Sequence, residues 1–459
     1  MKKDIRISKE LLNKIMNDRG IKTQTELSEK MGITKNQLSV ILSEKFNPLK
    51  SNVVKLCETL DINFNDIMEI DSEKIKQLSF NDFKSIEKII DNKYEKDNKL
   101  VDITKVKAKR PYTAVELFAG AGGLALGLEK AGFEDCGLVE FDKHACNTLR
   151  KNRPDWNVIE ADVTKIAEEG IYKYIKGIEI DLLSGGYPCQ AFSYAGNKAG
   201  LNDVRGTMFY YYAEILSQLK PKVFLAENVK GLVTHDNGKT LKIMIDVFEK
   251  IGYKVQWKVH SALDFHVAQK RQRIVIIGIR NDLIDKSEFK FPKPFKEKLT
   301  LRDALKNVPK SEGQQYSEKK RKVLDLVPSG GCWVDLPEEI AKEFMGKSYY
   351  SGGGKRGMAR RISWDEPCLT LTCSPAQKQT ERCHPDETRP FTTREYARIQ
   401  SFPDEWIFEG SIGQIYKQIG NAVPVNLAKA IGLSIVDFLN RVEENNVCKE
   451  IAVTNNCNK

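Results

Sequence analysis

The sequence has no long apolar run. No stretch of its 459 residues approaches the roughly 18 to 20 consecutive apolar residues that a membrane-spanning helix needs. The first residues, MKKDIRISKELLNK, have no apolar segment before a small-residue cleavage site, so they do not resemble a secretory signal. With 41% hydrophobic and 30% charged residues, the composition is typical of a soluble globular protein. We expect no membrane association and a cytoplasmic location.

Cysteine pairs with metal-binding spacing are also missing. The ten cysteines include no Cys-x-x-Cys pair, which argues against a zinc ribbon, and a cytoplasmic chain keeps its thiols reduced. The segment from Cys368 through Cys373 to Cys383 and His384 matches no common zinc pattern. We interpret these cysteines as thiols in and beside a strand and expect no metal. A catalytic thiolate stays compatible with this pattern.

The charge excess is modest. A net charge of +10 is compatible with a nucleic-acid partner but does not require one. The chain is long enough for two or three domains.

Residues 1–70 predict a small helical domain. In TQTELSEKMGITKNQLSVIL, Leu27 and Met31 share one helix face, and Gly32 supplies a turn before a second helix. The segment resembles the helix-turn-helix of phage-repressor-like regulators. Polar residues on the first turn of its second helix could meet base edges or phosphates, or the domain could dock on a protein. These residues are Lys35, Asn36 and Gln37.

Residues 71–110 predict one packing helix followed by a charged linker. The apolar positions of an amphipathic piece lie between residues 75 and 90. The stretches DNKYEKDNKL and TKVKAKRPY then indicate a solvated tether, with a basic strand lying on phosphate as the alternative.

After Pro111 short β-rich runs alternate with helical stretches, which predicts an α/β fold with a doubly wound, mostly parallel sheet over 111–284. The runs are TAVELF, CGLVEF, NVIEAD, IDLLSGG, KVFLAENV, KVQWKVHSA and RIVIIGIR. Residues 285–390 lose this rhythm and predict a separate irregular lobe. Residues 391–445 return to helix, and 446–459 predict a frayed tail.

A glycine cluster, ELFAGAGGLALGLEKAG, follows the first of these strands. A backbone without side chains at this position lets a ligand lie against the chain. The same pattern occurs in enzymes that bind NAD or FAD and where a helix packs tightly on a strand. Glu140 ends the next strand 20 residues beyond Gly120, where a carboxylate accepts from ribose hydroxyls, and Asp162 repeats the placement. Two acids suit a sulfonium cofactor without pyrophosphate, which favours S-adenosylmethionine.

Cys189 lies in GGYPCQAFSYAG, which follows the strand IDLLS and should therefore lie at the carboxyl edge of the sheet. Most cysteines are buried and inert, but Pro188 stiffens this loop and polar residues flank the thiol. Glu227, beside Asn228, ends another strand; in isolation these two could be a capping acid and a turn residue.

A thiol and a carboxyl group beside a methyl donor suggest methylation of cytosine. Carbon 5 of cytosine is a poor nucleophile, so a thiolate must add to carbon 6 to form an enamine. The carboxyl group stabilises the charge that develops at the ring nitrogen and amino edge. A base in a duplex must be flipped out before it can be reached.

In AQKRQRIVIIG, Arg271 and Arg273 occupy alternate positions at the start of a strand, so both could face a phosphate or the flipped nucleotide. A surface charge cluster is the alternative.

With these motifs the chain resembles the DNA cytosine-5 methyltransferase family, including its bacterial restriction-modification members. The resemblance covers about 113–280 and 391–430 and rests on FAGAGG, GGYPCQAFS, ENV, Gln-x-Arg-x-Arg from Gln269, and QIGNAVP from Gln418. It implies a class I S-adenosylmethionine-dependent, Rossmann-like domain. It implies Cys189 as nucleophile and Glu227, assisted by Arg271 and Arg273, on the cytosine. The implied cofactor residues are Phe118, Gly120, Leu124, Glu140, Phe141, Asp162, Val163, Pro188, Met208, Asn421 and Ala422.

The resemblance also implies DNA contacts. Three polar residues would contact DNA near the flipped base: Gln190, Ser193 and Gln269. The irregular lobe takes the place of a target-recognition domain, in which four basic residues could reach bases and phosphates. These are Lys355, Arg356, Arg360 and Arg361. The helix-turn-helix domain would bind a promoter and control transcription of the modification genes. A partner restriction endonuclease is implied, with monomeric catalysis and dimerisation on an operator as an option.

Two alternatives stay open. A family branch with the same cysteine loop modifies tRNA, although the large lobe and the helix-turn-helix domain favour double-stranded DNA. The chain could also be a transcription regulator with a vestigial enzyme domain, although every chemical position is intact. Amino-group methylation needs an Asp/Asn/Ser-Pro-Pro-aromatic loop, which the sequence lacks. A nicotinamide oxidoreductase would leave Cys189 and Glu227 unexplained.

Overall fold

The computed structural model describes residues 5–7, 9–18, 20–21, 23–42, 68–70, 100–175, 179–188, 207–350 and 357–457. The chain forms two compact units, Met1–Asp97 and Asn98–Lys459. Several predictions concern positions outside the described residues. These are the amphipathic piece at 75–90 and the site residues Cys189, Gln190, Ser193, Lys355 and Arg356.

The first unit contains the predicted helix pair. Helix α1 (Lys9–Asp18) is followed by α2 (Gln24–Lys30) and α3 (Lys35–Ile41), and Gly32 has the left-handed φ of 59° that the turn requires. Leu27, Met31 and Leu38 are buried between them. The expected all-α domain is wrong in one respect. Strand β1 (Ile5–Ile7) pairs antiparallel with β2 (Met68–Ile70), and strands this short and this distant in sequence carry no local signal.

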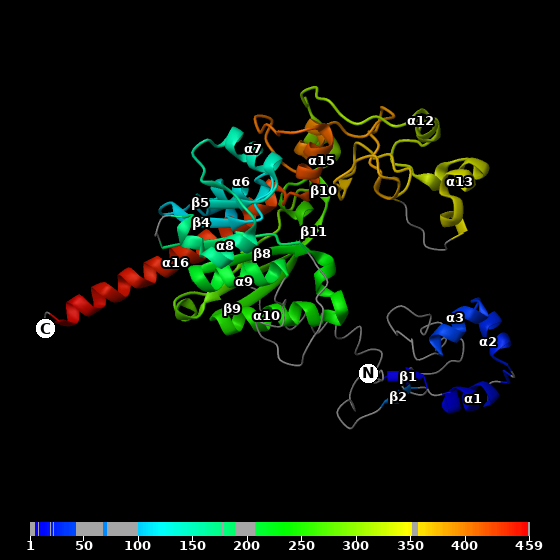
Figure 1. Ribbon diagram of the computed structural model, residues 1–459, viewed down its shortest axis with the longest axis horizontal. Coiled ribbons are helices and arrows are strands. Elements are labelled where there is room, and N and C mark those ends of the chain that lie inside the picture. Colours follow the sequence, from blue (N-terminus) through cyan, green and yellow to red (C-terminus); the bar gives the residue numbers. More distant parts are fainter. Residues whose placement is uncertain are drawn as a thin grey trace. The chain divides into compact units, whose positions relative to one another are not determined.

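The second unit is built on a seven-stranded sheet that contains all seven predicted strands (Figure 1). In spatial order they are β6 (Val158–Glu160), β5 (Phe133–Glu140), β4 (Tyr112–Leu117), β7 (Leu182–Gly185), β8 (Val223–Val229), β11 (Gln272–Arg280) and β9 (Tyr253–Ser261). The first five strands are parallel, and β11 is antiparallel to both of its neighbours. The predicted doubly wound, mostly parallel sheet is confirmed.

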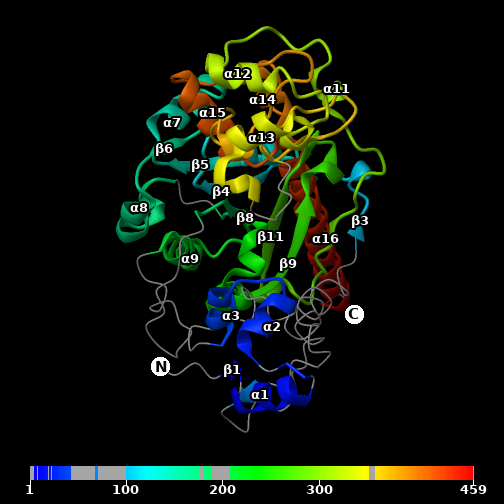
Figure 2. The same cartoon turned by 90° about the vertical axis from the view of Figure 1, so that its right-hand side faces the viewer.

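The connections run outward in two directions from β4. Helices α6 (Gly123–Glu129) and α7 (Lys143–Asn152) lead to β5 and β6, whereas α8 (Val163–Glu169), α9 (Met208–Leu219) and α10 (Lys239–Ile251) lead to β7, β8 and β9. Right-handed crossovers therefore place the two groups on opposite faces. Figure 2 shows α9 and α16 (Val425–Cys457) on opposite sides of the strands. The strand order reverses between β4 and β7, which is where such sheets bind ligands.

Helix α6 packs against α16 and the residues that precede it. A Cβ atom on Gly123 would lie 2.3 Å from the carbonyl oxygen of Val423, and one on Gly127 would lie 2.3 Å from the Cβ of Ala428. Glycine is therefore required at both positions. By length and composition Ile412–Asn445 could cross a membrane, but 72% of its apolar window is buried inside the protein, as in a core helix.

The basic segment before β4 is packed and is not the solvated tether that its charges suggested. Strand β3 (Leu100–Val101) pairs in parallel with β12 (Phe291–Pro292), and Ile103 is buried. Arg110 forms ion pairs of 2.8 Å with both Asp181 and Glu443. Residues 100–110 therefore pack within the second unit, where Ile103 is buried and Arg110 pairs with Asp181 and Glu443.

The irregular lobe has a small core of its own, formed by Tyr316, Leu324, Val327, Leu336, Ala341, Ala359 and Cys383. Its helices α12 (Glu318–Leu324) and α13 (Glu338–Met345) lie to one side of the sheet (Figure 1). The two ends of the predicted lobe, residues 285–390, do not belong to this small core. Helix α11 (Leu301–Leu305) and residues such as Ile362 and Leu371 pack in the same core as Leu138 and Leu149 of the sheet layer.

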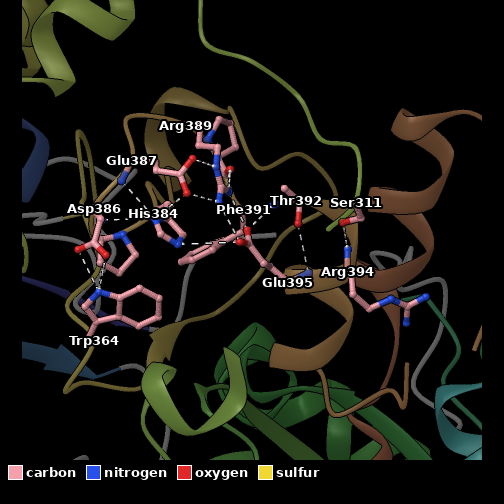
Figure 3. A network of polar contacts seen from close by, with 12 residues as sticks. Ser311, Trp364, His384, Asp386, Glu387, Arg389, Phe391, Thr392, Arg394 and Glu395 are labelled. Atoms are coloured by element: carbon pink, nitrogen blue, oxygen red, sulfur yellow. Dashed lines mark hydrogen bonds and ion pairs between the residues drawn. The ribbon is translucent and has the colours of Figure 1, made fainter. Parts of the chain in front are cut away.

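A buried polar network fixes the return from the lobe to helix α14 (Thr393–Ile399) (Figure 3). Arg389 donates to both carboxylate oxygens of Glu395 at 2.7 and 2.9 Å and also pairs with Glu387. Glu395 forms a capping box with Thr392 at the start of α14. Because Glu395 caps the helix and binds Arg389, the network fixes the direction of α14.

The C-terminal end also differs from the prediction of a frayed tail. Helix α16 continues to Cys457, and no proline or glycine interrupts residues 433–457.

The packing of α6 predicts a stability change. Gly127→Ala should destabilise the protein by about 1–3 kcal/mol, because the added methyl group meets backbone atoms of residues 425 and 429 as well as Ala428. The matched control is Gly413→Ala in helix α15 (Ile412–Asn421), where a Cβ atom has nothing within 4 Å. This control should be neutral or stabilising by up to about 1 kcal/mol. Urea unfolding of both variants measures the difference, and equal stabilities would contradict the packing argument.

Candidate functional site

A glycine-rich loop leaves the carboxyl end of β4 and contacts the end of β5. Phe118, Gly120 and Gly122 all have positive φ angles, of 58°, 54° and 83°. The backbone N–H of Gly120 donates to Oε2 of Glu140 at 2.7 Å. The other oxygen of Glu140 accepts from the N–H groups of Phe141 and Asp142 at 2.9 and 2.7 Å. The carboxylate that the sequence placed opposite the loop therefore holds the loop itself.

Open space lies beside these residues. A Cβ atom on Gly120 would have nothing within 4 Å, whereas one on Gly122 would collide with Leu149 and Trp406. Phe141, the residue after Glu140, is 75% exposed and so presents an apolar ring to solvent.

The other predicted cofactor residues lie at neighbouring element ends. Asp162 is exposed and caps α8 by accepting from the N–H of Thr164 at 2.8 Å, and Val163 is buried behind it. Met208 begins α9, Leu124 is buried in α6, and Pro188 is exposed after β7.

The C-terminal motif reaches the same region. A Cβ atom on Gly123 would lie 3.1 Å from the Cβ of Ala422, so the end of α15 lies directly against the start of α6. Trp406 donates from its indole nitrogen to the carbonyl oxygen of Ala121 at 3.2 Å. Asn421 accepts from the thiol of Cys373 at 2.9 Å. The structure thus brings residues about 300 positions apart to one edge of the sheet.

Glu227 and Arg273 form the second part of the site. They lie on the adjacent strands β8 and β11, in diagonal register, and Arg273 Nε is 2.8 Å from Glu227 Oε1. Each side chain is only 13% exposed. Burial raises the pKa of the Glu227 carboxyl group, and the positive charges of Arg273 and Arg271 partly offset this shift. The carboxyl group therefore keeps its proton to a higher pH than an exposed glutamate would.

The base of the cysteine loop is fixed to this pair. A Cβ atom on Gly186 would lie 3.0 Å from Glu227 Oε2, so the loop passes directly over the carboxyl group. Asn228 is buried and donates to the carbonyl oxygen of Tyr187 at 2.9 Å. Sequence reasoning left Asn228 as a possible turn residue. Its place beside Glu227 at the end of a strand was the only signal for this positioning role.

Strand alternation predicted that Arg271 and Arg273 could face the same side, but the two side chains have different partners: Arg273 pairs with Glu227, and Arg271 does not join it there. Strand β10 (Gln269–Lys270) ends before β11 begins, and the N–H of Arg271 donates to the carbonyl oxygen of Gln269. This break removes the alternation. The guanidinium group of Arg271 is 2% exposed and donates to backbone carbonyl groups of Leu371, Gly420 and Ala422.

Three predicted DNA contacts are also engaged inside the protein. Gln269 is fully buried and bonds to Gln400 and to the N–H of Leu371. Arg361 is 5% exposed and donates to carbonyl groups of Val327, His384 and Leu324. Arg360 pairs with Glu366 at 2.5 Å. Gln269 and Arg361 are therefore not exposed for the DNA contacts that were predicted. The Gln269 side chain is held by Gln400 and Leu371, and the donors of Arg361 satisfy buried backbone carbonyl groups of the lobe.

On the helix-turn-helix unit, Lys35, Asn36 and Gln37 are exposed. The Gln37 side chain accepts from the N–H of Thr34 at 2.8 Å and so caps its own helix. Of the three predicted residues, Lys35 and Asn36 are therefore better placed than Gln37 to contact a partner.

Comparison with known proteins gives two family matches. Residues 112–437 match the C-5 cytosine-specific DNA methylase family, and residues 11–73 match a Cro/C1-type helix-turn-helix DNA-binding domain.

Individual relatives agree. The chain is 58% identical over 441 residues to the type II methyltransferase M.Sau96I of Staphylococcus aureus, covering 95% of this chain and all of that protein. It is 59% identical to M.PspPI of Psychrobacter sp., covering 73% of this chain and 81% of that protein, and 55% identical to M.Eco47II of Escherichia coli, covering 75% and 83%. A solved prophage-encoded E. coli protein, assigned as a DNA modification methyltransferase, aligns with a TM-score of 0.54 at 26% identity, over 72% of this chain and 99% of that one.

Members of the matched family use S-adenosylmethionine as methyl donor. The ordered motifs, the seven-stranded sheet and the match over 112–437 lead to one conclusion. The chain belongs to the C-5 cytosine-specific DNA methylases and is a DNA (cytosine-5-)-methyltransferase with an N-terminal Cro/C1-type helix-turn-helix domain.

Proposed function

We propose that this enzyme modifies a flipped-out cytosine within a specific duplex DNA sequence and protects that sequence from a cognate restriction endonuclease. The relatives named type II methyltransferases support the restriction-modification role, since one of them matches 95% of this chain. The observation that carries the catalytic assignment is the buried Glu227–Arg273 pair beneath the base of the cysteine loop.

The carboxyl edge of β4, β5 and β6 suits S-adenosylmethionine. The open backbone at Gly120, the exposed ring of Phe141 and the acids Glu140 and Asp162 offer a cradle, an aromatic face and negative charge. They fit a ligand with a ribose, a purine and a sulfonium group and no phosphate. When bound, S-adenosylmethionine supplies an electrophilic methyl group. The remaining proposed contacts are Phe118, Leu124, Val163, Pro188, Met208, Asn421 and Ala422.

Cys189 acts as the nucleophile. Its thiolate adds to carbon 6 of cytosine, and the electrons of the carbon 5–carbon 6 double bond make carbon 5 nucleophilic. After methylation, loss of the proton from carbon 5 restores the double bond and expels the thiolate. The ties of Gly186 and Tyr187 to β8 hold the base of this loop against Glu227.

Glu227 donates a hydrogen bond to the cytosine ring. The ring nitrogen N3 is an acceptor, so only a protonated carboxyl group can bind it, and the neighbouring amino group can donate to the other carboxyl oxygen. Because burial raises the pKa of Glu227, its carboxyl group keeps this proton to a higher pH than an exposed glutamate would. Arg273 holds the carboxyl group in place and balances the charge that it carries after proton transfer.

Because Gln269, Arg271 and Arg361 are buried, other residues would contact DNA. Gln190 and Ser193 of the cysteine loop, together with Lys355 and Arg356 of the lobe, would contact DNA around the flipped base. We further propose that the helix-turn-helix unit binds an operator near its own gene through Lys35 and Asn36, as a dimer, while catalysis is monomeric.

The tRNA alternative has less support, because relatives that are 55–59% identical over the aligned residues are named as type II methyltransferases. A vestigial enzyme domain would be expected to have lost residues needed for catalysis. Here Glu227 and Arg273 are both present and pair at 2.8 Å, which does not favour this alternative.

The nucleophile can be tested by trapping. Duplex DNA containing 5-fluorocytosine should form a covalent adduct with the protein and S-adenosylmethionine, because fluorine cannot leave as a proton does. Cys189→Ala should abolish the adduct and the methylation, whereas Cys136→Ala, a half-buried cysteine outside the motifs, should retain both. Bisulfite sequencing of a methylated plasmid library would give the recognition sequence. An adduct with Cys189→Ala would refute the assignment, and labelling of tRNA alone would refute the substrate.

The acid can be tested by pH. Because the protonated form is required, kcat should fall as the pH rises through the raised pKa of Glu227. Glu227→Gln should lower kcat by about 10²–10³-fold and remove this limb, since an amide can donate to N3 but cannot transfer a proton. The exposed Glu249→Gln is the matched control and should keep the wild-type profile. An unchanged pH limb in Glu227→Gln would exclude Glu227 as the titrating acid.

The regulatory role can be tested on the full chain. Combined Lys35→Ala and Asn36→Ala substitutions should weaken binding to the DNA upstream of the gene by about tenfold or more, at unchanged methylation rate. Ser39→Ala, also exposed on α3, should change neither. Gel-shift titrations with competitor DNA measure the effect. Equal wild-type affinity for upstream and unrelated DNA would end the operator proposal.

A further inference from the structure

Arg271 lies where three separate segments of the second unit meet. Its Nη1 donates to the carbonyl oxygen of Leu371 at 3.2 Å. Its Nη2 donates to the carbonyl oxygens of Gly420 and Ala422, each at 3.0 Å. One buried guanidinium group therefore joins the entrance of β11 to the segment returning from the lobe and to the end of helix α15.

The two carbonyl groups at 420 and 422 flank Asn421. The last carbonyl groups of a helix have no partner within the helix, and their partial negative charge attracts a cation. Arg271 satisfies both at the point where α15 ends at Asn421. The backbone on each side of Asn421 is thereby fixed, and with it the direction in which this residue and Ala422 meet the cofactor loop.

A pair of buried glutamines reinforces the same joint. Gln269 donates to Gln400 at 2.8 Å, and Gln400 donates to the carbonyl oxygen of Ile419 at 2.8 Å. A Cβ atom on Gly420 would lie 2.4 Å from the carbonyl oxygen of Thr372, so the two segments that Arg271 joins touch directly. Gln400 also donates to the carbonyl oxygen of Ala422 at 3.2 Å, so Arg271 and Gln400 share this acceptor.

We propose that Arg271 is a positioning residue for the cofactor: it holds Asn421 and Ala422 against the S-adenosylmethionine site and makes no contact with the nucleotide. The inference rests on the proposed cofactor role of these two residues. It assigns different tasks to the two arginines of one motif, since Arg273 reaches Glu227 and Arg271 reaches the C-terminal motif.

The test compares Arg271→Met and Arg271→Lys with Arg361→Met. Arg361 is a matched control because it is also buried and also donates to backbone carbonyl groups, but it does so inside the core of the lobe. Calorimetry gives the Kd for S-adenosylmethionine, a filter-binding titration gives the Kd for duplex DNA, and thermal unfolding gives the Tm of each full-length variant.

Arg271→Met should raise the Kd for S-adenosylmethionine by about tenfold or more, equivalent to about 1.4 kcal/mol, with the Kd for DNA within about threefold of wild type. Arg271→Lys should give a smaller increase, of at least about threefold, because an ammonium group keeps the charge but not the fork that reaches three carbonyl groups. Arg361→Met should lower the Tm while leaving the Kd for S-adenosylmethionine unchanged.

Other results would overturn the inference. An unchanged Kd for S-adenosylmethionine in both Arg271 variants, with a lower Tm, would reduce Arg271 to a structural residue. Weakened DNA binding with unchanged cofactor binding would place Arg271 on the nucleotide after all. If Arg271→Met does not fold, Arg271→Lys decides by the same criteria. A wild-type protein that binds no S-adenosylmethionine would instead refute the proposed function itself.

Discussion

The close contact between α6 and the residues that lead into α16 is the constraint on which the site depends. The first motif and the last one are separated by about 300 residues, and they meet because Gly123 and Gly127 leave no side chain between the two backbones. Because a Cβ atom would lie 2.3 Å from its neighbours, any larger residue would force the two backbones apart at a cost in stability. A chain that cannot make this approach could build the sheet but would not bring the end of α15 against the start of α6.

The chemistry of the second half of the site follows from burial. A carboxyl group beneath the cysteine loop would be neutral in an apolar environment and ionised beside an arginine in water. Here both influences act on Glu227, and burial is the larger. A ring nitrogen that gains electron density needs a neighbouring acid. That acid must be protonated before the reaction and able to release its proton during it. The direct contact of Arg273 and the more distant charge of Arg271 keep the acid from becoming too weak to respond.

The sequence predicted elements whose signals are local and failed where distant partners decide. All seven strands of the sheet and the helix pair around Gly32 were predicted, because alternating apolar runs and a turn glycine are read within a dozen residues. The spacing of Gly120 and Glu140 predicted a cofactor carboxylate at the end of β5, but the hydrogen bond by which Glu140 holds the Gly120 loop was not predicted. Strand β1 pairs with residues 61 to 65 positions away, so no local sequence pattern marks the pairing. Arg110 was assigned to a tether because its partners Asp181 and Glu443 lie far along the chain.

Arginine was the residue type most often misjudged, and the reason is physical. A guanidinium group carries five donors in a rigid fork, so it can satisfy several buried carbonyl groups as well as it can bind phosphate. Arg271 and Arg361 do the former, and Arg389 pairs with Glu395. The net charge of +10 therefore overstates the positive charge available at the surface for a polyanion, because some of the arginines are buried. An ammonium group is more strongly hydrated than a guanidinium group, which is why arginine is the cation used at such buried contacts, whereas Lys35 is exposed.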